Sequence, residues 1–144
     1  MADGVEEDWP TEHLPDEARL YRRVPIGFYR GRGGILDVDG KPTVGAFHDE
    51  HHPGSLSTNW ERYATPEATR LQGGKNPQSN GVVRLVVRSV LQIDRVSVRH
   101  SPDRANNNRA HTDIEFPVDQ ALQVRTELRE RCEIELKPPR DAAG

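Results

Sequence analysis

Residues 81–100 read GVVRLVVRSVLQIDRVSVRH, and this stretch decides the fold. Its first part, residues 82–88, is the richest apolar run in the chain and is dominated by β-branched valines, which favours a buried strand. The end of the run is also compatible with a short helix near Ser89. Residues 95–100 then alternate between apolar and polar side chains, as a half-buried strand does. The stretch therefore predicts the central core element and a second strand.

Further strand signals lie on both sides of this stretch. Residues 20–24, LYRRV, alternate and stop before a proline, so they predict a first strand. Residues 35–37 and 43–47 flank an Asp-Gly dipeptide, which is a strong hairpin signal, and they predict a β-hairpin. Residues 110–116 follow a loop dense in turn formers and predict another strand.

Two segments carry helix signals. Thr65 precedes a proline and a glutamate, a combination typical of an N-cap, and it predicts a short helix that ends near Leu71. Residues 118–132 repeat apolar side chains at helical spacing and predict an amphipathic helix, and residues 134–136 predict an edge strand. We therefore expect an α+β domain with a small, largely antiparallel sheet, a C-terminal amphipathic helix and one short helix.

Length and composition favour a single domain. The chain has 144 residues, of which 33% are hydrophobic and 30% charged, so its core must be small. We expect residues 1–17 to form an acidic flexible tail, residues 18–137 the α+β domain and residues 138–144 a disordered end. No stretch approaches the roughly 18 apolar residues of a membrane span, and we expect a cytoplasmic protein without a membrane partner. Cys132 is the only cysteine, which excludes an intramolecular disulfide.

Charge is distributed unevenly along the chain. Residues 1–17 hold seven acidic residues and no Lys or Arg, whereas the rest holds 20 basic against 16 acidic residues. Residues 84–109 are the most electropositive segment. Such a segment is either a solvated strand face and loop or a surface that contacts an anion, a nucleotide or a nucleic acid. The candidate contact residues are Arg84, Arg88, Arg95, Arg99, Arg104, Asn107 and Arg109.

His100 and His111 are candidates for proton transfer. His100 ends one predicted strand and His111 begins the next, so antiparallel pairing is expected to bring them together beside the arginines. Imidazole titrates near neutrality and could act as general acid or base in a pocket that binds a phosphate. The alternative is a polar loop in which Asn and His side chains satisfy the backbone groups of turns.

A histidine-rich loop at residues 47–52, FHDEHH, raises the question of a metal site. His48, His51 and His52 stand beside two carboxylates, and this ligand set suits Zn, Ni or Mn. Adjacent side chains on one loop rarely converge on an ion without ligands from elsewhere. The three histidines are therefore possible ligands only, and the sequence assigns no cofactor.

Three short patterns resemble the residue order of mono-ADP-ribosyltransferases. That class carries an arginine on an early strand, then a Ser/Thr strand, then an acid-x-acid strand. The matching positions here are Arg22 or Arg23, Ser57-Thr58, and Asp113 with Glu115. The resemblance implies that one of the acids orients the nicotinamide ribose of a bound substrate. Signatures of other classes, such as Walker A, GxSxG and HExxH, do not occur in the sequence.

Several segments also resemble a group of small bacterial proteins without a settled activity. The similarity covers most of residues 18–116, and it implies no reaction. It rests on LYRRV (20–24), Ala46-Phe47, LSTNWERYATPE (56–67), GVV (81–83) and the strand entry at 107–111. The chain departs from the group at the basic spacer 104–109 and at the histidine-rich loop.

Two classes of function follow from these features. We expect an accessory protein that binds a macromolecular partner, most simply a protein, through the arginine-rich segment, with the acidic tail tuning or competing for that surface. The alternative is an enzyme or toxin-like domain that acts on a nucleotide or nucleic acid. In that case His100 and His111 are the proton-transfer pair and the arginines hold phosphates. An ADP-ribosyltransferase-like activity is a variant of this alternative.

Overall fold

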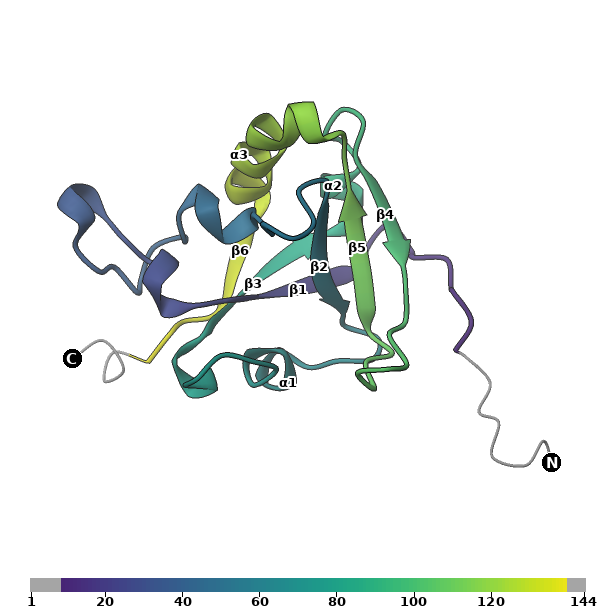
Figure 1. Cartoon of the computed structure of the whole chain (residues 1–144), viewed down its shortest axis with the longest axis horizontal. Helices are drawn as coiled ribbons and strands as arrows, with labels where there is room; N and C mark the ends of the chain where they lie inside the picture. Colours follow the sequence, from purple (N-terminus) through teal and green to yellow (C-terminus); the bar gives the residue numbers. More distant parts are fainter. Residues whose placement is uncertain (1–8, 140–144) are drawn as a thin grey trace.

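The strand β1 (Arg19–Val24) lies in the interior of an antiparallel sheet of six strands, with the order β4-β5-β2-β1-β3-β6 (Figure 1). A computed structural model of the chain describes residues 9–139. β1 pairs along its whole length with β3, from Arg19 opposite Val86 to Val24 opposite Gly81. The other strands are β2 (Ser55–Trp60), β3 (Gly81–Val86), β4 (Ser97–His100), β5 (His111–Glu115) and β6 (Glu133–Leu136).

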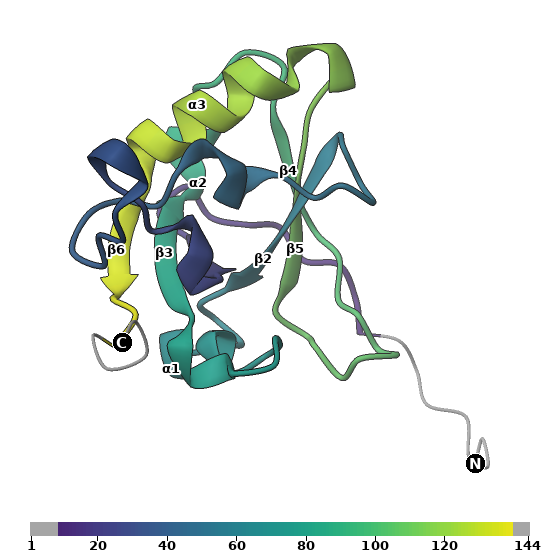
Figure 2. The ribbon, with the colours of Figure 1, turned by 60° about the vertical axis from the view of Figure 1, so that its left-hand side comes forward.

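The helices are short except for the last one. α3 (Ala121–Arg131) lies across one face of the sheet, and α1 (Pro66–Arg70) lies at the other end of the sheet, as Figure 2 shows. α2 (Val87–Val90) continues directly from β3. Single 3₁₀ turns are η1 (Ile26–Phe28), η2 (Arg32–Gly34), η3 (Val44–Phe47), η4 (Pro77–Ser79) and η5 (Val118–Gln120). This is the expected small α+β fold with an antiparallel sheet and a C-terminal helix.

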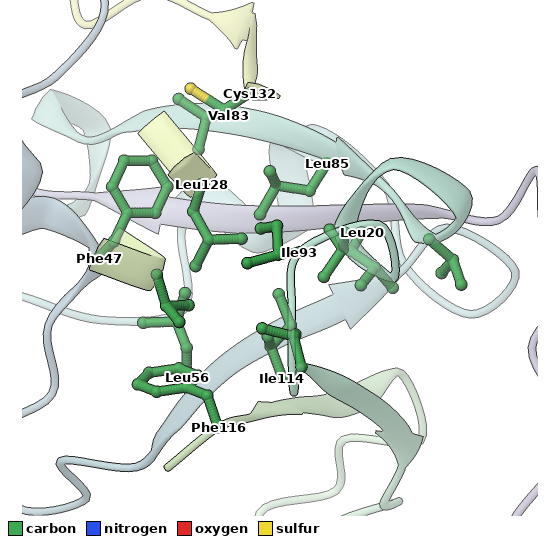
Figure 3. Packing of buried hydrophobic residues seen from close by; sticks show 14 of the residues in the cluster. Leu20, Phe47, Leu56, Val83, Leu85, Ile93, Ile114, Phe116, Leu128 and Cys132 are labelled. Atoms are coloured by element: carbon green, nitrogen blue, oxygen red, sulfur yellow. The ribbon is translucent and has the colours of Figure 1, made fainter. Parts of the chain in front are cut away.

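The core lies between the sheet and α3. Alternate strand residues such as Leu20, Leu56 and Ile114 are fully buried and meet Leu128 of α3 and Phe47 of η3 (Figure 3). Burial of each such side chain stabilises the fold by about 1.5–3 kcal/mol. Because strand side chains alternate between faces, this packing leaves the opposite face of β1, β2 and β5 for polar residues.

The predicted helix starts and most strands are confirmed. Thr65 caps α1, since its side-chain oxygen accepts a hydrogen bond from the backbone N–H of Ala68 at 3.1 Å. The closing helix ends within one residue of the predicted bound but begins at Ala121, because residues 118–120 form the 3₁₀ turn η5 instead. The edge strand β6 begins one residue earlier than predicted. The end of the apolar run at residues 82–88 forms α2, the short helix with which its sequence is compatible.

The hairpin predicted at 35–37 and 43–47 is wrong. The chain turns earlier, at Gly33 and Gly34, whose φ angles of 74° and 76° suit glycine, and an isolated bridge joins Arg30 to Leu36. Residues 43–47 instead enter η3, which places Phe47 in the core. The two glycines close the turn before the Asp-Gly dipeptide is reached.

The N-terminal segment from residue 9 packs on the domain. Leu14 belongs to the core with 8% of its surface exposed, and the Arg104 guanidinium lies 4.4 Å from the Trp9 ring centroid. Glu12 donates its backbone N–H to Nδ1 of His100 at 3.0 Å. The remainder of the predicted tail, residues 1–8, lies outside the described residues, as do residues 140–144 of the predicted disordered end. Among the described helices, none is long and apolar enough to cross a membrane.

Candidate functional site

A groove of about 930 Å³ opens in the sheet where β1 and β2 separate. These strands pair only at Leu20 with Trp60 and at Tyr21 with Asn59, and then they diverge. The groove is lined by residues of β1, β2 and β5, and its rim comes from the loops around residues 45–51 and 103–108. Its size falls within the range of small-molecule sites, roughly 300–1,000 Å³.

The guanidinium of Arg22 lies in the gap between the two strands. Nε donates to the carbonyl oxygen of Ala46 at 3.1 Å, and Nη1 donates to the carbonyl oxygen of Ser57 at 3.0 Å. Burial lowers the pKa of Arg22 to about 10, and the neighbouring cation of Arg23 acts in the same direction, while Asp49 opposes it. Among residues 9–139, no carboxylate forms an ion pair with Arg22. A cation withdrawn from water without a counter-ion is a site that favours an anion.

Arg23 adds a second positive charge to the same groove. A Cβ atom at Gly73 would lie only 2.2 Å from Nη1 of Arg23. The lack of a side chain at this position therefore makes room for the Arg23 guanidinium. Within the described part of the chain, Arg23 has no carboxylate partner either. Arg22 follows the core-facing residues of β1 and reaches η3, whereas Arg23 points to the opposite face and reaches Gly73, so the groove carries one charge from each side of β1.

A hydrogen-bonded chain links Ser57 to His111 in the groove. The Ser57 hydroxyl lies 3.1 Å from Nε2 of His111, and Nδ1 of His111 lies 2.8 Å from the carbonyl oxygen of Ser101. A carbonyl only accepts hydrogen bonds, so Nδ1 carries the proton in the neutral ring. Nε2 is then the acceptor for the Ser57 hydroxyl.

Asp113 lies next to this pair on β5. Its Oδ1 is 3.7 Å from Nε2 of His111, and its Oδ2 accepts a hydrogen bond of 2.7 Å from the Ser101 hydroxyl. Ser55 donates to Oδ1 at 3.4 Å, and Arg99 forms an ion pair with Oδ2 at 3.7 Å. The carboxylate is thus held in place where it stabilises a positive charge on the imidazole.

The structure does not bring His100 and His111 together as a pair. His100 stands opposite Thr112 in the sheet, and its ring points to the core, whereas the ring of His111 points to the polar face. Nδ1 of His100 accepts from the Glu12 backbone, and Nε2 lies 2.7 Å from the carbonyl oxygen of Arg109. Both ring nitrogens are used in holding the fold, so only His111 keeps a role at the groove.

The arginines of residues 84–109 are engaged within the chain. Arg84 pairs with Glu133 at 3.0 Å, and Arg99 pairs with Glu115 at 3.1 Å. Arg109 lies 3.7 Å from Glu12. Asn107 occupies a turn with φ of 52° and is exposed. The further contacts are Arg88 with Glu17, Arg95 with Asp94, and Arg104 with the ring of Trp9.

The histidine-rich loop does not gather metal ligands. His48, His51 and His52 are exposed, and His51 lies 3.8 Å from Glu50. No group of three or more potential metal-binding side chains occurs within residues 9–139. His48 and His51 instead form part of the groove rim.

Comparisons with protein-family models, curated proteins and solved structures find no match, so the chemistry of the groove carries the functional argument. The residue order shared with mono-ADP-ribosyltransferases falls on adjacent strands: Arg22 on β1, Ser57 on β2 and Asp113 on β5. The Ser57–His111 contact, and the absence of a carboxylate partner for Arg22 among the described residues, could not be found from sequence, because both depend on where β1 and β2 separate.

Proposed function

We propose that the groove binds a nucleotide with a pyrophosphate group and that the chain is an enzyme acting on it in the manner of ADP-ribosyltransferases. The observation that carries this proposal is Arg22, a half-buried cation at the groove whose described neighbours include no carboxylate ion-pair partner. Guanidinium groups bind phosphate oxygens with matched geometry, so Arg22 and Arg23 suit a pyrophosphate.

The other end of the groove supplies the chemistry. Asp113 and His111 lie beside Ser57, and the resemblance to ADP-ribosyltransferases gives the acid the role of orienting the nicotinamide ribose. The proposal places the phosphates on the arginines and the attached sugar at these groups, which line the same groove. The carboxylate of Asp113 stabilises the positive charge that develops on the ribose as nicotinamide leaves. The proposed reaction is cleavage of the bond between nicotinamide and ribose in NAD⁺.

The test is release of nicotinamide from NAD⁺ by the purified protein, measured by chromatography. Arg22→Gln should reduce kcat/KM at least tenfold, because it removes the charge that holds the phosphates. Arg88→Gln is the matched control, since Arg88 is exposed and pairs with Glu17 away from the groove. Wild-type protein that releases no nicotinamide, or equal loss in both variants, contradicts the proposal.

Binding of a macromolecular partner through the arginine-rich segment stays a prediction. The contacts above give five of its six arginines a carboxylate within the chain, namely Arg84, Arg88, Arg95, Arg99 and Arg109. A partner would have to compete with these ion pairs, whereas an anion in the groove meets no such competition at Arg22. The groove is therefore the better supported site.

A further inference from the structure

The Ser57 hydroxyl is placed as a nucleophile would be. It lies in the groove, half-buried, in the middle of β2, and its Oγ is 3.1 Å from Nε2 of His111. A serine hydroxyl becomes reactive when an adjacent base accepts its proton. Orienting the sugar through an acid requires no such contact, so the pair is not explained by the proposed function alone.

The surroundings of His111 fit the role of a base. Nδ1 donates to the Ser101 carbonyl oxygen at 2.8 Å, which fixes the ring orientation and leaves the lone pair of Nε2 toward Ser57. The Ser101 hydroxyl donates to Asp113, so its oxygen too can only accept from Nδ1. When Nε2 takes a proton, the ring becomes a cation that faces the Asp113 carboxylate at 3.7 Å. In serine nucleophile triads an acid holds the nitrogen of the base that faces away from the serine. Here the Ser101 carbonyl does this at Nδ1, and Asp113 faces Nε2, the nitrogen that takes the proton.

The anion site and the hydroxyl are joined through one residue. Nη1 of Arg22 binds the backbone carbonyl of Ser57 itself at 3.0 Å. A phosphate bound by Arg22 would therefore lie in the same groove as the Ser57 hydroxyl.

We infer that Ser57 is the first acceptor in the reaction and forms a covalent ribosyl intermediate, an inference that rests on the proposed function. Ser57 Oγ bonds to the ribose carbon as the bond from that carbon to nicotinamide breaks. The electron pair of the broken bond stays on the nicotinamide nitrogen, which leaves neutral, and the hydroxyl proton passes to Nε2 of His111. In the second step a water attacks the same carbon as the bond to Ser57 breaks. The proton on Nε2 of His111 passes back to the released Ser57 oxygen, and the attacking water releases its own proton to the solvent.

The stereochemistry of the product distinguishes this route from direct attack by water. Two displacements at one carbon retain its configuration, whereas a single displacement inverts it. With methanol added as acceptor, β-NAD⁺ is expected to give the β-methyl riboside, whose configuration is stable to NMR analysis. The α-methyl product overturns the inference.

The intermediate is sought directly by acid quenching of the protein with NAD⁺ from milliseconds to minutes, followed by intact and peptide mass spectrometry. One ADP-ribosyl group on Ser57 is expected, and it should be lost in Ser57→Ala. Ser97→Ala is the matched control, since Ser97 is an exposed strand serine on β4 that does not line the groove. His111→Gln should lower the rate of adduct formation at least a hundredfold and flatten its pH profile.

The outcomes separate the two proposals. Nicotinamide release at the wild-type rate by Ser57→Ala, or release without any adduct on Ser57, overturns the role of Ser57 and leaves the proposed function standing. Absence of release from the wild-type protein overturns both. Circular dichroism melting of each variant shows whether it is folded, and the adduct on wild-type protein does not depend on any variant.

Discussion

The sharpest consequence of the Arg22 environment is that a small anion should stabilise the protein. The pKa of Arg22 is lowered from its ordinary value to about 10, chiefly by burial and also by the neighbouring cation of Arg23, while Asp49 opposes the shift. Because 1 pKa unit corresponds to about 1.4 kcal/mol, keeping this residue charged costs the folded state about 3 kcal/mol. The lowered pKa belongs to a base, so the full cost applies at pH 7, and folding stability should rise only as the pH passes above 10.

A bound pyrophosphate offsets this cost. A ligand whose concentration is roughly 100 times its Kd stabilises the folded state by about 3 kcal/mol. For a domain of this size, a gain of that order raises Tm by roughly 10 °C. The assay is differential scanning calorimetry at pH 7 with increasing pyrophosphate, with potassium chloride at matched ionic strength as the control for general salt effects.

Arg22→Met removes the charge and keeps most of the side-chain volume. Two carbonyl groups lose their donors, while the desolvation cost of the cation disappears, so the unliganded variant should melt close to wild type. Its Tm should no longer respond to pyrophosphate. An equal rise of Tm in Arg22→Met and wild type would refute the assignment of the anion to this residue.

Four further outcomes follow from single contacts. Thr65→Ala should lower the free energy of unfolding by about 1 kcal/mol in urea titrations, because it removes the α1 cap; no change would mean that the cap bond does not form. Gly73→Ala should reduce the rise of Tm that pyrophosphate causes in calorimetry, because the added Cβ displaces the Arg23 guanidinium. The Tm without ligand should change little, since this side chain is flexible. An unaltered rise would contradict the placement of Arg23. The pKa of Glu12 is lowered chiefly by its hydrogen bond from Tyr63, so its contribution to stability is present above pH 4.5 and is lost as the pH falls below it. Glu12→Gln should therefore weaken the loss of stability at acidic pH, measured by urea titrations. An unchanged loss would exclude Glu12 as its source. If the arginine-rich segment binds a partner, charge reversal at Arg99 and Arg109 should weaken binding and reduce its salt dependence, and binding that survives both changes rejects that surface.

The fold was largely accessible from the sequence because local signals agree with the observed structure. Valine-rich residues 82–86 lie in the interior strand β3, and the cap at Thr65 begins α1. The hairpin prediction failed because the chain turns at the dipeptide Gly33-Gly34 and not at Asp39-Gly40. Residues 43–47 then form η3, which buries Phe47 in the core. The alternation of apolar and polar residues did not predict β2, and only the Ser57-Thr58 pattern pointed to a strand there. A strand with one polar face between loops gives a weak periodic signal.

The site was less accessible. Alternation along β4 and β5 decides that His100 points to the core and His111 to the groove, and a shift of one residue in either strand would exchange these roles. Charge counting favoured the arginines of residues 84–109, yet pairing across strands and with the N-terminal segment neutralises most of them. Arg22 matters because it lacks such a partner in the described chain, a property that no count of charges contains.

A crystal structure with ADP-ribose tests most directly whether phosphates lie on Arg22 with the attached sugar at Ser57 and His111. We expect the pyrophosphate within hydrogen-bond distance of the Arg22 guanidinium and the terminal ribose beside Ser57 Oγ and Nε2 of His111. ADP-ribose bound elsewhere, or bound in the groove with its phosphates away from Arg22, would contradict this expectation.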